Sequence, residues 1–459
     1  MPSLSKADLV LVAFPGVRSL ACSASLIGRF MSREQKQARE GVGMSDLNRE
    51  RQPARFRAVI VVCSLFFIIY LGNSLWLSLF PNYLLRLGMD SFMIGIALMI
   101  YNASLSITFL PSGRLSDKLG RRPLIVAGSS LLALSTVSLS LSHQVETTLL
   151  AVIGEGIGLG LLTPSGNAMI SDAVPGRGSG VVFATYQIAT LAAAVVGSFS
   201  AGVLAEWVGF QSMFLLSAML AAGTAIIGYF VVPETLAGKA HGYASAVGES
   251  ISSSISGTVR MLRSNRELAF LAGALVIHAI GFSMINPFIS LYAEKGIHLD
   301  IAQVGIIISV WNAGIAIAQI PSGQLTDRFG AKPLLLAHFI LSSIIWVIYA
   351  YSWNLESGII TILLFGIVGA LDMPARRTIM VEYATEETGK ATIIGSLDAV
   401  TGATGILGPL IGGLVWAQMG YAAPFHLAGL VNAFACVPLI VIMRKRARHG
   451  SPSLVRSGT

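Results

Sequence analysis

Long apolar runs alternate with short polar connections along most of the chain. Twelve continuous apolar segments lie near residues 57–80, 92–112, 123–142, 147–169, 179–205, 211–232, 268–292, 302–322, 333–352, 357–380, 391–416 and 422–443. A run of about 20 apolar residues crosses the hydrocarbon core of a bilayer as a helix. Because the runs are continuous and do not alternate with period two, they predict membrane-spanning α-helices and not a β-barrel.

Composition supports a membrane protein and excludes two other classes. Of the 459 residues, 54% are hydrophobic and only 12% are charged, whereas a soluble domain carries about 25% charged residues. Too few charges exist to cover a water-soluble surface, and the apolar content excludes a disordered chain. A net charge of +8 suggests nucleic acid in a soluble protein, but here the basic residues separate apolar runs, so we expect no nucleic-acid partner.

The basic residues also predict an orientation. If the N-terminus is inside, Lys and Arg gather in the connections of the cytoplasmic side, and the opposite side holds only Arg86 and Lys295. Such an asymmetry places both termini in the cytoplasm. We expect a multi-pass protein of the plasma membrane.

The longest connection, rich in Ser and Gly, separates two groups of six spans. The predicted parts are an N-terminal cytoplasmic extension (1–56), an N-terminal six-helix bundle (57–232), a central cytoplasmic loop (233–267), a C-terminal six-helix bundle (268–443) and a cytoplasmic tail (444–459). We interpret the first 43 residues as a mis-called start or a poorly ordered extension. Residues 243–255 could form a surface helix, but a flexible linker is the preferred interpretation.

A segment of the chain recurs at an offset of 210 residues. Residues 111–124 read Pro-Ser-Gly-Arg-Leu-Ser-Asp-Lys-Leu-Gly-Arg-Arg-Pro-Leu, and residues 321–334 read Pro-Ser-Gly-Gln-Leu-Thr-Asp-Arg-Phe-Gly-Ala-Lys-Pro-Leu. The same offset pairs Gly95 with Gly305, Pro164 with Pro374 and Asp172 with Glu382. A parallel repeat of six spans predicts an all-α membrane protein with two pseudo-symmetric bundles facing a central pathway.

The repeated segment predicts a breakable latch at the cytoplasmic side. Gly113 would let two helix ends approach closely, and Gly120 would permit a tight reversal. Asp117 can cap a neighbouring helix N-terminus, and Arg121 and Arg122 can pair with acids such as Asp172. The simpler alternative is that these charges only set the topology. The corresponding residues of the second copy are Gly323, Asp327, Arg328, Gly330, Lys332 and Glu382.

Residues 113–124 resemble the signature loop of the major facilitator superfamily, Gly-x-Leu-Ala/Ser-Asp-Arg/Lys-x-Gly-Arg/Lys-Arg/Lys, at every fixed position. The second copy departs from it at Thr326 and Ala331, so a weaker latch is expected there. The resemblance extends over nearly the whole chain and implies the family fold, with alternating access by rocking of two bundles.

Within this family the chain is similar to the twelve-span drug/proton antiporter branch, with two departures. The fourth span has Glu155 where that branch has Gln, and it lacks the preceding Arg. The Gly-Pro-x-x-Gly-Gly run of the fifth span occurs instead in the eleventh, at residues 408–413. These departures weaken the prediction of antiport and leave that of a transporter intact.

Ionisable groups at membrane depth are costly and mark candidate sites. Glu155 is interpreted equally as a protonation site or cation ligand and as a structural hydrogen-bonding group, whereas its flanking glycines favour close helix packing. Asp372 and Arg376, four residues apart, share a helix face that Asp398 could join. We favour an intracellular ion-pair gate for these three, with a proton or substrate site as the alternative.

Histidines and neutral polar residues complete the candidates. His278 is interpreted as a satisfied packing residue, and His338 is a still weaker candidate. Cavity lining and plain interhelical hydrogen bonding stay equally open for Asn73, Trp76, Asn102, Gln187, Asn312 and Gln319. No metal-ligand spacing, nucleophile motif or phosphate loop is apparent, so we expect neither an enzyme nor a cofactor beyond a proton gradient.

These features predict a secondary active transporter that exports an amphipathic or hydrophobic small molecule in exchange for protons, as multidrug efflux antiporters do. The pathway candidates are few, acidic and flanked by apolar residues, and no span carries several cations. The expected partners are the small molecule, protons and the bilayer, with a monomeric protein. The alternatives are uptake or facilitated passage of a sugar or carboxylate, and a receptor or scaffold that does not transport.

Overall fold

A computed structural model describes residues 46–173, 179–231, 260–383 and 390–448. Within these ranges the chain forms α-helices and no β-strand. Twelve helical segments of the described chain are long and apolar enough to cross a membrane, which confirms the predicted number. The start or extension before residue 46, the proposed linker at 243–255 and the end of the tail lie outside the described residues.

The first repeat supplies six spans. They are formed by α3 (Asp46–Leu77) with α4 (Phe80–Arg86), α5 (Ser91–Leu119), α6 (Arg121–Leu141), α7 (Val145–Ala173), α8 (Ser179–Trp207) and α9 (Phe210–Val231). The first span reaches Arg86, beyond the predicted end at residue 80. Between α3 and α4 the helix is interrupted next to Pro81, whose ring nitrogen has no hydrogen to donate.

The second repeat supplies the other six spans from more broken helices. They are α11 (Arg266–Ile285) with α12 (Phe288–Lys295), α13 (Ile301–Phe329), α14 (Ala331–Tyr349), α15 (Leu355–Gly369) with α16 (Asp372–Glu382), α17 (Lys390–Gly405) with α18 (Gly408–Met419), and α19 (Ala423–Arg448). Each interruption lies beside a proline: Pro287, Pro374 or Pro409. The missing N–H and the ring of proline explain why these spans divide.

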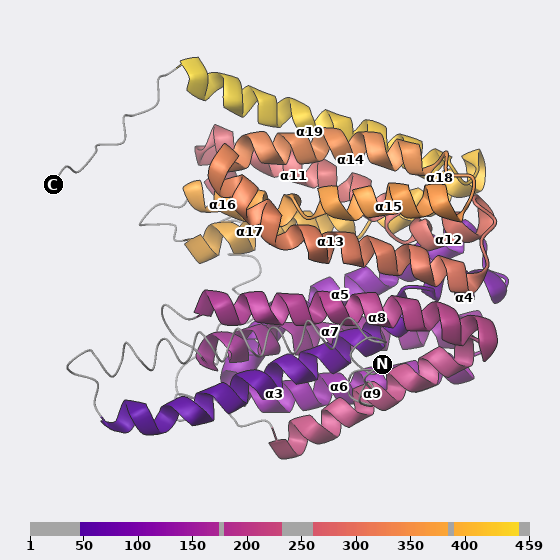
Figure 1. Ribbon diagram of the computed structural model, residues 1–459, viewed down its shortest axis with the longest axis vertical. Helices are drawn as coiled ribbons and strands as arrows, with labels where there is room; N and C mark the ends of the chain where they lie inside the picture. The colour runs from indigo at the N-terminus through magenta and orange to yellow at the C-terminus, as the bar shows by residue number, and fades with distance from the viewer. Residues whose placement is uncertain (1–45, 174–178, 232–259, 384–389, 449–459) are drawn as a thin grey trace, which may run out of the picture. The chain divides into compact units, whose positions relative to one another are not determined.

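The packing of helices is repeated along with the sequence. In the first repeat α3 packs on α8 and α9, and α6 packs on α7 and α9 (Figure 1). In the second repeat α11 packs on α17, α18 and α19, and α14 packs on α15, α16 and α19. The same neighbours recur in the same order, which is the pseudo-symmetry expected from the offset of 210 residues.

The chain divides into two compact units that exchange short segments. Residues 300–313, at the start of α13, belong with the first unit, and residues 84–102, which include the start of α5, belong with the second. The domain limits drawn from the sequence follow the repeat, and they stay a prediction.

Glycines at equivalent positions of the repeat make these exchanges possible. A Cβ on Gly305 of α13 would lie 2.6 Å from the Cα of Gly202 in α8. A Cβ on Gly95 of α5 would lie 2.5 Å from the carbonyl oxygen of Pro409 in α18. Only residues without a side chain allow backbones this close. The pairing of Gly95 with Gly305 therefore reflects helix contact.

Candidate functional site

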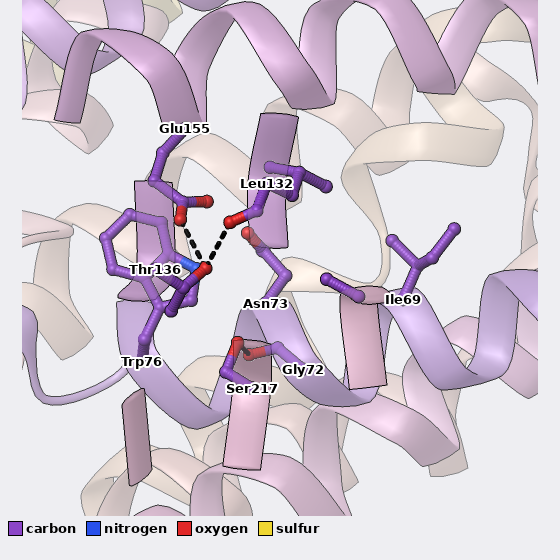
Figure 2. A pocket seen from close by; sticks show the side chains of 9 residues that line it. Ile69, Gly72, Asn73, Trp76, Leu132, Thr136, Glu155 and Ser217 are labelled. Atoms are coloured by element: carbon purple, nitrogen blue, oxygen red, sulfur yellow. Dashed lines mark hydrogen bonds between the residues drawn. The ribbon is translucent and has the colours of Figure 1, made fainter. Parts of the chain in front are cut away.

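A small pocket inside the first unit contains Glu155. Its lining comes from α3, α6, α7 and α9, and consists of Ile69, Gly72, Asn73, Trp76, Leu132, Thr136, Glu155, Ser217 and Ala221 (Figure 2). Glu155 is 1% exposed. The carboxyl oxygen Oε2 of Glu155 and the amide oxygen Oδ1 of Asn73 are buried without a hydrogen-bond partner among the described residues. The pocket thus holds two buried oxygen acceptors without a described donor.

One hydroxyl connects Glu155 to the backbone of α6. The Thr136 Oγ1 lies 2.6 Å from Glu155 Oε1 and 2.5 Å from the carbonyl oxygen of Leu132. A hydroxyl carries one hydrogen and can make a full bond to only one of these two acceptors. When Glu155 is ionised, Thr136 donates to Glu155. When Glu155 carries a proton, it can donate to Thr136, which then donates to Leu132 (Figure 2).

Glycines of α7 bring the neighbouring helices close to Glu155. A Cβ on Gly154 would lie 2.1 Å from the Ser135 hydroxyl of α6. A Cβ on Gly158 would lie 3.0 Å from the carbonyl oxygen of Gly128, also in α6. A Cβ on Gly160 would lie 2.8 Å from the Thr108 side chain of α5. Close packing, the favoured interpretation of these glycines, is confirmed at these three positions.

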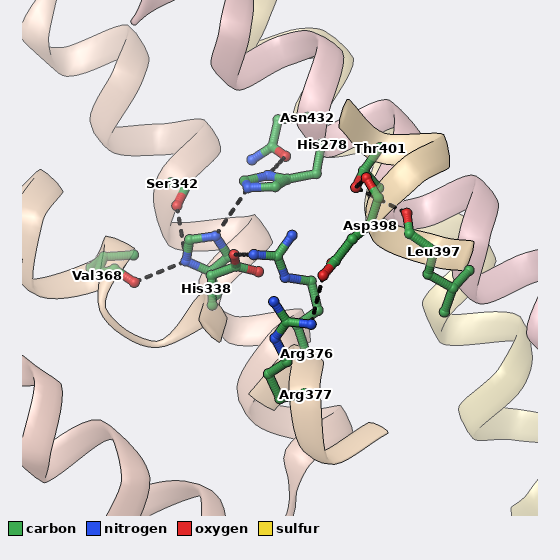
Figure 3. A network of polar contacts seen from close by, with 11 residues as sticks. His278, His338, Ser342, Val368, Arg376, Arg377, Leu397, Asp398, Thr401 and Asn432 are labelled. Carbon is green, nitrogen blue, oxygen red and sulfur yellow. Dashed lines mark hydrogen bonds and ion pairs between the residues drawn. The ribbon is translucent and has the colours of Figure 1, made fainter. Parts of the chain in front are cut away.

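A second polar cluster lies inside the second unit, where α16 begins. Arg376 Nη2 lies 3.1 Å from Asp372 Oδ2, as the spacing of four residues predicts. Asp398 does not join them, because it pairs with Arg377 at 2.7 Å. The expected three-residue cluster is therefore wrong in its membership: the structure has two separate ion pairs (Figure 3).

Two histidines meet beside Asp372. His278 of α11 and His338 of α14 bring their Nε2 atoms to 3.4 Å. His278 Nδ1 lies 2.8 Å from Asn432 Oδ1, and His338 Nδ1 lies 2.8 Å from the carbonyl oxygen of Val368. Both rings are thus bonded packing groups, as expected for His278. Their contact with each other was not expected, because it joins residues that are 60 positions apart.

The two polar clusters lie among equivalent helices of the repeat. The Glu155 pocket lies among α3, α6, α7 and α9. The histidine cluster lies among α11, α14, the α15–α16 pair and α19. Sequence reasoning missed Thr136 and Asn432, because the sequence does not show which buried group a single Thr or Asn of a span will contact.

The repeated signature segment is mostly helical and not a loop. Residues 113–119 form the end of α5, and residues 323–329 form the end of α13. The reversals fall on Gly120 and Gly330, whose φ angles are 100° and 86°, as predicted for Gly120. A Cβ on Gly113, or on Gly323, would meet no described atom within 4 Å, so the close approach expected at Gly113 stays a prediction.

The arginines that follow Gly120 contact their own unit. Arg121 donates to the Ser116 hydroxyl at 3.2 Å. Arg122 donates to the carbonyl oxygen of Tyr229 and lies over the ring of that residue. The side chains of Asp117 and Asp172 lie outside the described part of the structure, so the predicted cap and the pairing with Asp172 stay predictions.

In the second copy the equivalent pair is formed. Lys332 Nζ lies 2.8 Å from Glu382 Oε2. Arg328 instead lies over the neighbouring Phe329 ring, 5.4 Å from its centre. Asp327 is exposed and makes no hydrogen bond or ion pair to another described residue. The charged contact of this copy is therefore Lys332–Glu382.

The neutral polar candidates differ in their contacts. Asn312 of α13 donates to its own helix at Ile308, 2.9 Å away, and lies 3.4 Å from the Ser198 hydroxyl of α8. Trp76 is buried in the wall of the Glu155 pocket. Asn102 and Gln187 are half-buried. Asn312 thus supports interhelical bonding, and Asn73 and Trp76 support pocket lining.

Comparison with known proteins decides the family. Residues 62–280 and 271–458 each match the sequence profile of the Major Facilitator Superfamily. The chain belongs to this superfamily. It is 26% identical over 380 residues to the multidrug resistance protein MdtG of Proteus mirabilis (strain HI4320), covering 80% of this chain and 91% of the relative.

One further relative and one solved structure agree with this assignment. The chain is 26% identical over 318 residues to a multi-drug resistance efflux pump PmrA homolog of Lactococcus lactis subsp. lactis (strain IL1403), covering 68% of this chain and 75% of that protein. Among solved structures, a bacterial homologue of the human lysosomal transporter Spinster superposes with a TM-score of 0.70 at 13% identity, covering 88% of this chain and all of that chain. This member of the Major Facilitator Superfamily is therefore a membrane transporter with the twelve-helix fold of that family.

Proposed function

We propose that this transporter exports an amphipathic or hydrophobic small molecule in exchange for protons. The protein acts as a monomer in the plasma membrane, with both termini in the cytoplasm. The names of the multidrug resistance relatives support export at 26% identity. The positive-inside asymmetry of the sequence supports the orientation.

The observation that carries proton coupling is the environment of Glu155. Its side chain is buried in a membrane-spanning helix, and its described polar contact is the Thr136 hydroxyl. A charged carboxylate at such a place is costly, and no ion pair joins it to a described cation. The ionised form of the Glu155 carboxyl is therefore costly, and its protonated form can donate a hydrogen bond. Such a carboxyl group is suited to take up and release a proton.

The Thr136 hydroxyl couples the protonation of Glu155 to a hydrogen bond with the backbone of α6. Protonation of Glu155 reverses the direction of its bond with Thr136 and turns the Thr136 hydroxyl toward Leu132. Deprotonation withdraws that hydroxyl from Leu132. The proton on α7 thereby changes a hydrogen bond inside α6, and this change links protonation to the conformation of the bundle.

The test uses purified protein in proteoliposomes loaded with a lipophilic cationic dye. Under an imposed pH gradient, the wild-type protein should drive dye against its concentration gradient. Glu155→Gln keeps the shape and removes the exchangeable proton, so it should abolish gradient-driven accumulation while downhill flux persists. The matched control is Glu146→Gln, an exposed carboxyl in the first turn of the same helix.

Two outcomes would contradict the proposal. Unchanged gradient-driven flux in Glu155→Gln would remove Glu155 from proton coupling. A wild-type protein that moves lipophilic dyes only downhill, or moves a sugar or carboxylate in their place, would overturn the export of such compounds by antiport.

A further inference from the structure

We propose that His278, His338 and Asp372 form a binding site for one divalent transition-metal ion such as Zn²⁺, for which Co²⁺ is the spectroscopic probe. The site lies inside the second unit and uses none of the residues around Glu155. One donor atom from each of the three side chains lies within 4.8 Å of the other two. Two imidazoles and one carboxylate are a ligand set that zinc accepts.

The hydrogen bonds of Asn432 fix the orientation of its side-chain amide. Asn432 is fully buried, and its Nδ2 donates to the carbonyl oxygen of Phe339 at 2.9 Å and to the Ser343 hydroxyl at 3.1 Å. A carbonyl oxygen only accepts, so the NH₂ group must face Phe339. The amide oxygen therefore faces His278 and accepts from its Nδ1, which lies 2.8 Å away. The Nε2 atom of a neutral His278 then carries a lone pair.

The second histidine is fixed in the same tautomer. His338 Nδ1 lies 2.8 Å from the carbonyl oxygen of Val368, which can only accept. Val368 lies near the end of α15, just before the break that precedes α16. A neutral His338 thus also carries its free lone pair on Nε2. Bonds from the second ring nitrogen to a carbonyl oxygen are the support that metal-binding histidines usually have.

The two lone pairs belong to atoms that face each other. The Nε2 atoms of His278 and His338 are 3.4 Å apart (Figure 3). Neither neutral ring can donate to the other, so both Nε2 lone pairs stay available to a bound cation. Two nitrogens bound tetrahedrally to one zinc at about 2.0–2.1 Å lie about 3.4 Å apart. The observed separation therefore matches two ligands of one ion.

The carboxylate supplies the third donor. Asp372 Oδ2 is engaged by Arg376 at 3.1 Å, whereas Oδ1 is buried without a hydrogen-bond partner among the described residues. An ion held by both Nε2 atoms and Oδ1 would satisfy all three groups. Arg376 already balances the charge of Asp372 and repels a second cation, so we expect weaker binding than at a closed structural zinc site.

The three ligands come from three different helices. His278 is on α11, His338 is on α14, and Asp372 is the first residue of α16, directly after the interruption at residues 370–371. A bound ion would hold the start of α16 against α11 and α14. Because bundle helices must rearrange during alternating access, metal binding should inhibit transport reversibly.

The test uses untagged protein in nanodiscs. Co²⁺ should bind with one ion per chain and give d–d absorption bands, and Zn²⁺ should displace it. His278→Gln and His338→Gln should each weaken Co²⁺ binding about 10-fold or more. The matched control is His143→Gln, an exposed histidine of the first unit, which should bind as the wild type does.

A variant that is expected to bind Co²⁺ more tightly controls for loss of binding by misfolding. Arg376→Gln removes the repelling cation and frees Asp372, so it should tighten Co²⁺ binding by about threefold or more. Absence of d–d bands, unchanged binding in both histidine variants, or weaker binding in Arg376→Gln would each overturn the proposal.

Discussion

Lys332 Nζ lies 2.8 Å from Glu382 Oε2 and so joins the second residue of α14 to the last residue of α16. The two side chains are 13% and 37% exposed. Their positions are the repeat equivalents of Arg122 and Asp172. The pair therefore ties the second copy of the signature segment, residues 321–334, to the span formed by α15 and α16.

Reversing this pair should reveal its role as a latch. Lys332→Glu or Glu382→Lys alone places like charges side by side, so each should lower the transport rate several-fold. The double variant restores the attraction and should recover most of the rate. The coupling energy in the double-mutant cycle of transport rates should be about 1–2 kcal/mol, within the range for residues in direct contact.

The control for this cycle is Arg444→Gln, an exposed cation near the end of α19, which should leave the rate unchanged. If both single reversals transport normally, the pair contributes only to topology.

Asp117 is expected to act in the same way at the first copy. Asp117→Asn removes the charge and keeps the size, so protein yield should be normal while the transport rate falls at least about 10-fold. The measurement is flux in proteoliposomes, normalised to reconstituted protein. Normal flux in Asp117→Asn would reject a latch at this residue.

Thr136 is expected to stabilise the first unit through Glu155. Thr136→Val keeps the volume but leaves the buried Glu155 carboxyl without its described partner, which should lower the free energy of unfolding by about 1–2 kcal/mol. Thermal unfolding in detergent measures the change. In the control, Thr224→Val, the lost hydroxyl donates only within its own helix, to Leu220 at 2.8 Å.

The loss should be clearly smaller in Thr224→Val than in Thr136→Val. Equal losses would mean that the contact with Glu155 adds nothing to stability.

The contact of Gly202 with Gly305 should tolerate no side chain. In Gly202→Ala the new Cβ would lie 2.8 Å from the Gly305 Cα, so α8 and α13 must separate. We expect a loss of about 1–3 kcal/mol in stability. The control is Gly223→Ala in α9, where a Cβ would meet no described atom within 4 Å. A Tm of Gly202→Ala equal to that of Gly223→Ala would contradict this packing.

The sequence predicted the twelve spans because hydropathy and the requirement for internal hydrogen bonding act on each span separately. It predicted the reversal at Gly120 because a positive φ strongly favours glycine. It did not predict the interruptions beside Pro287 and Pro374, since proline in a membrane helix can also bend it without a break, as α7 contains Pro164 and stays continuous.

The candidate sites were predicted less completely for a different physical reason. Glu155 was found because a carboxyl group in an apolar run is costly wherever it points. The contact between His278 and His338, and the pairing of Asp398 with Arg377, depend on which faces of different helices meet. No local pattern in a single sequence contains that information.

Because the Thr136 hydroxyl lies between Glu155 and Leu132, the protonation of Glu155 can be followed by infrared spectroscopy at the Leu132 carbonyl. The stretching frequency of a peptide C=O falls when it accepts an additional hydrogen bond. A ¹³C=¹⁸O label on Leu132 should therefore show an infrared band that moves when Glu155 gains or loses its proton, without any dye, substrate or gradient.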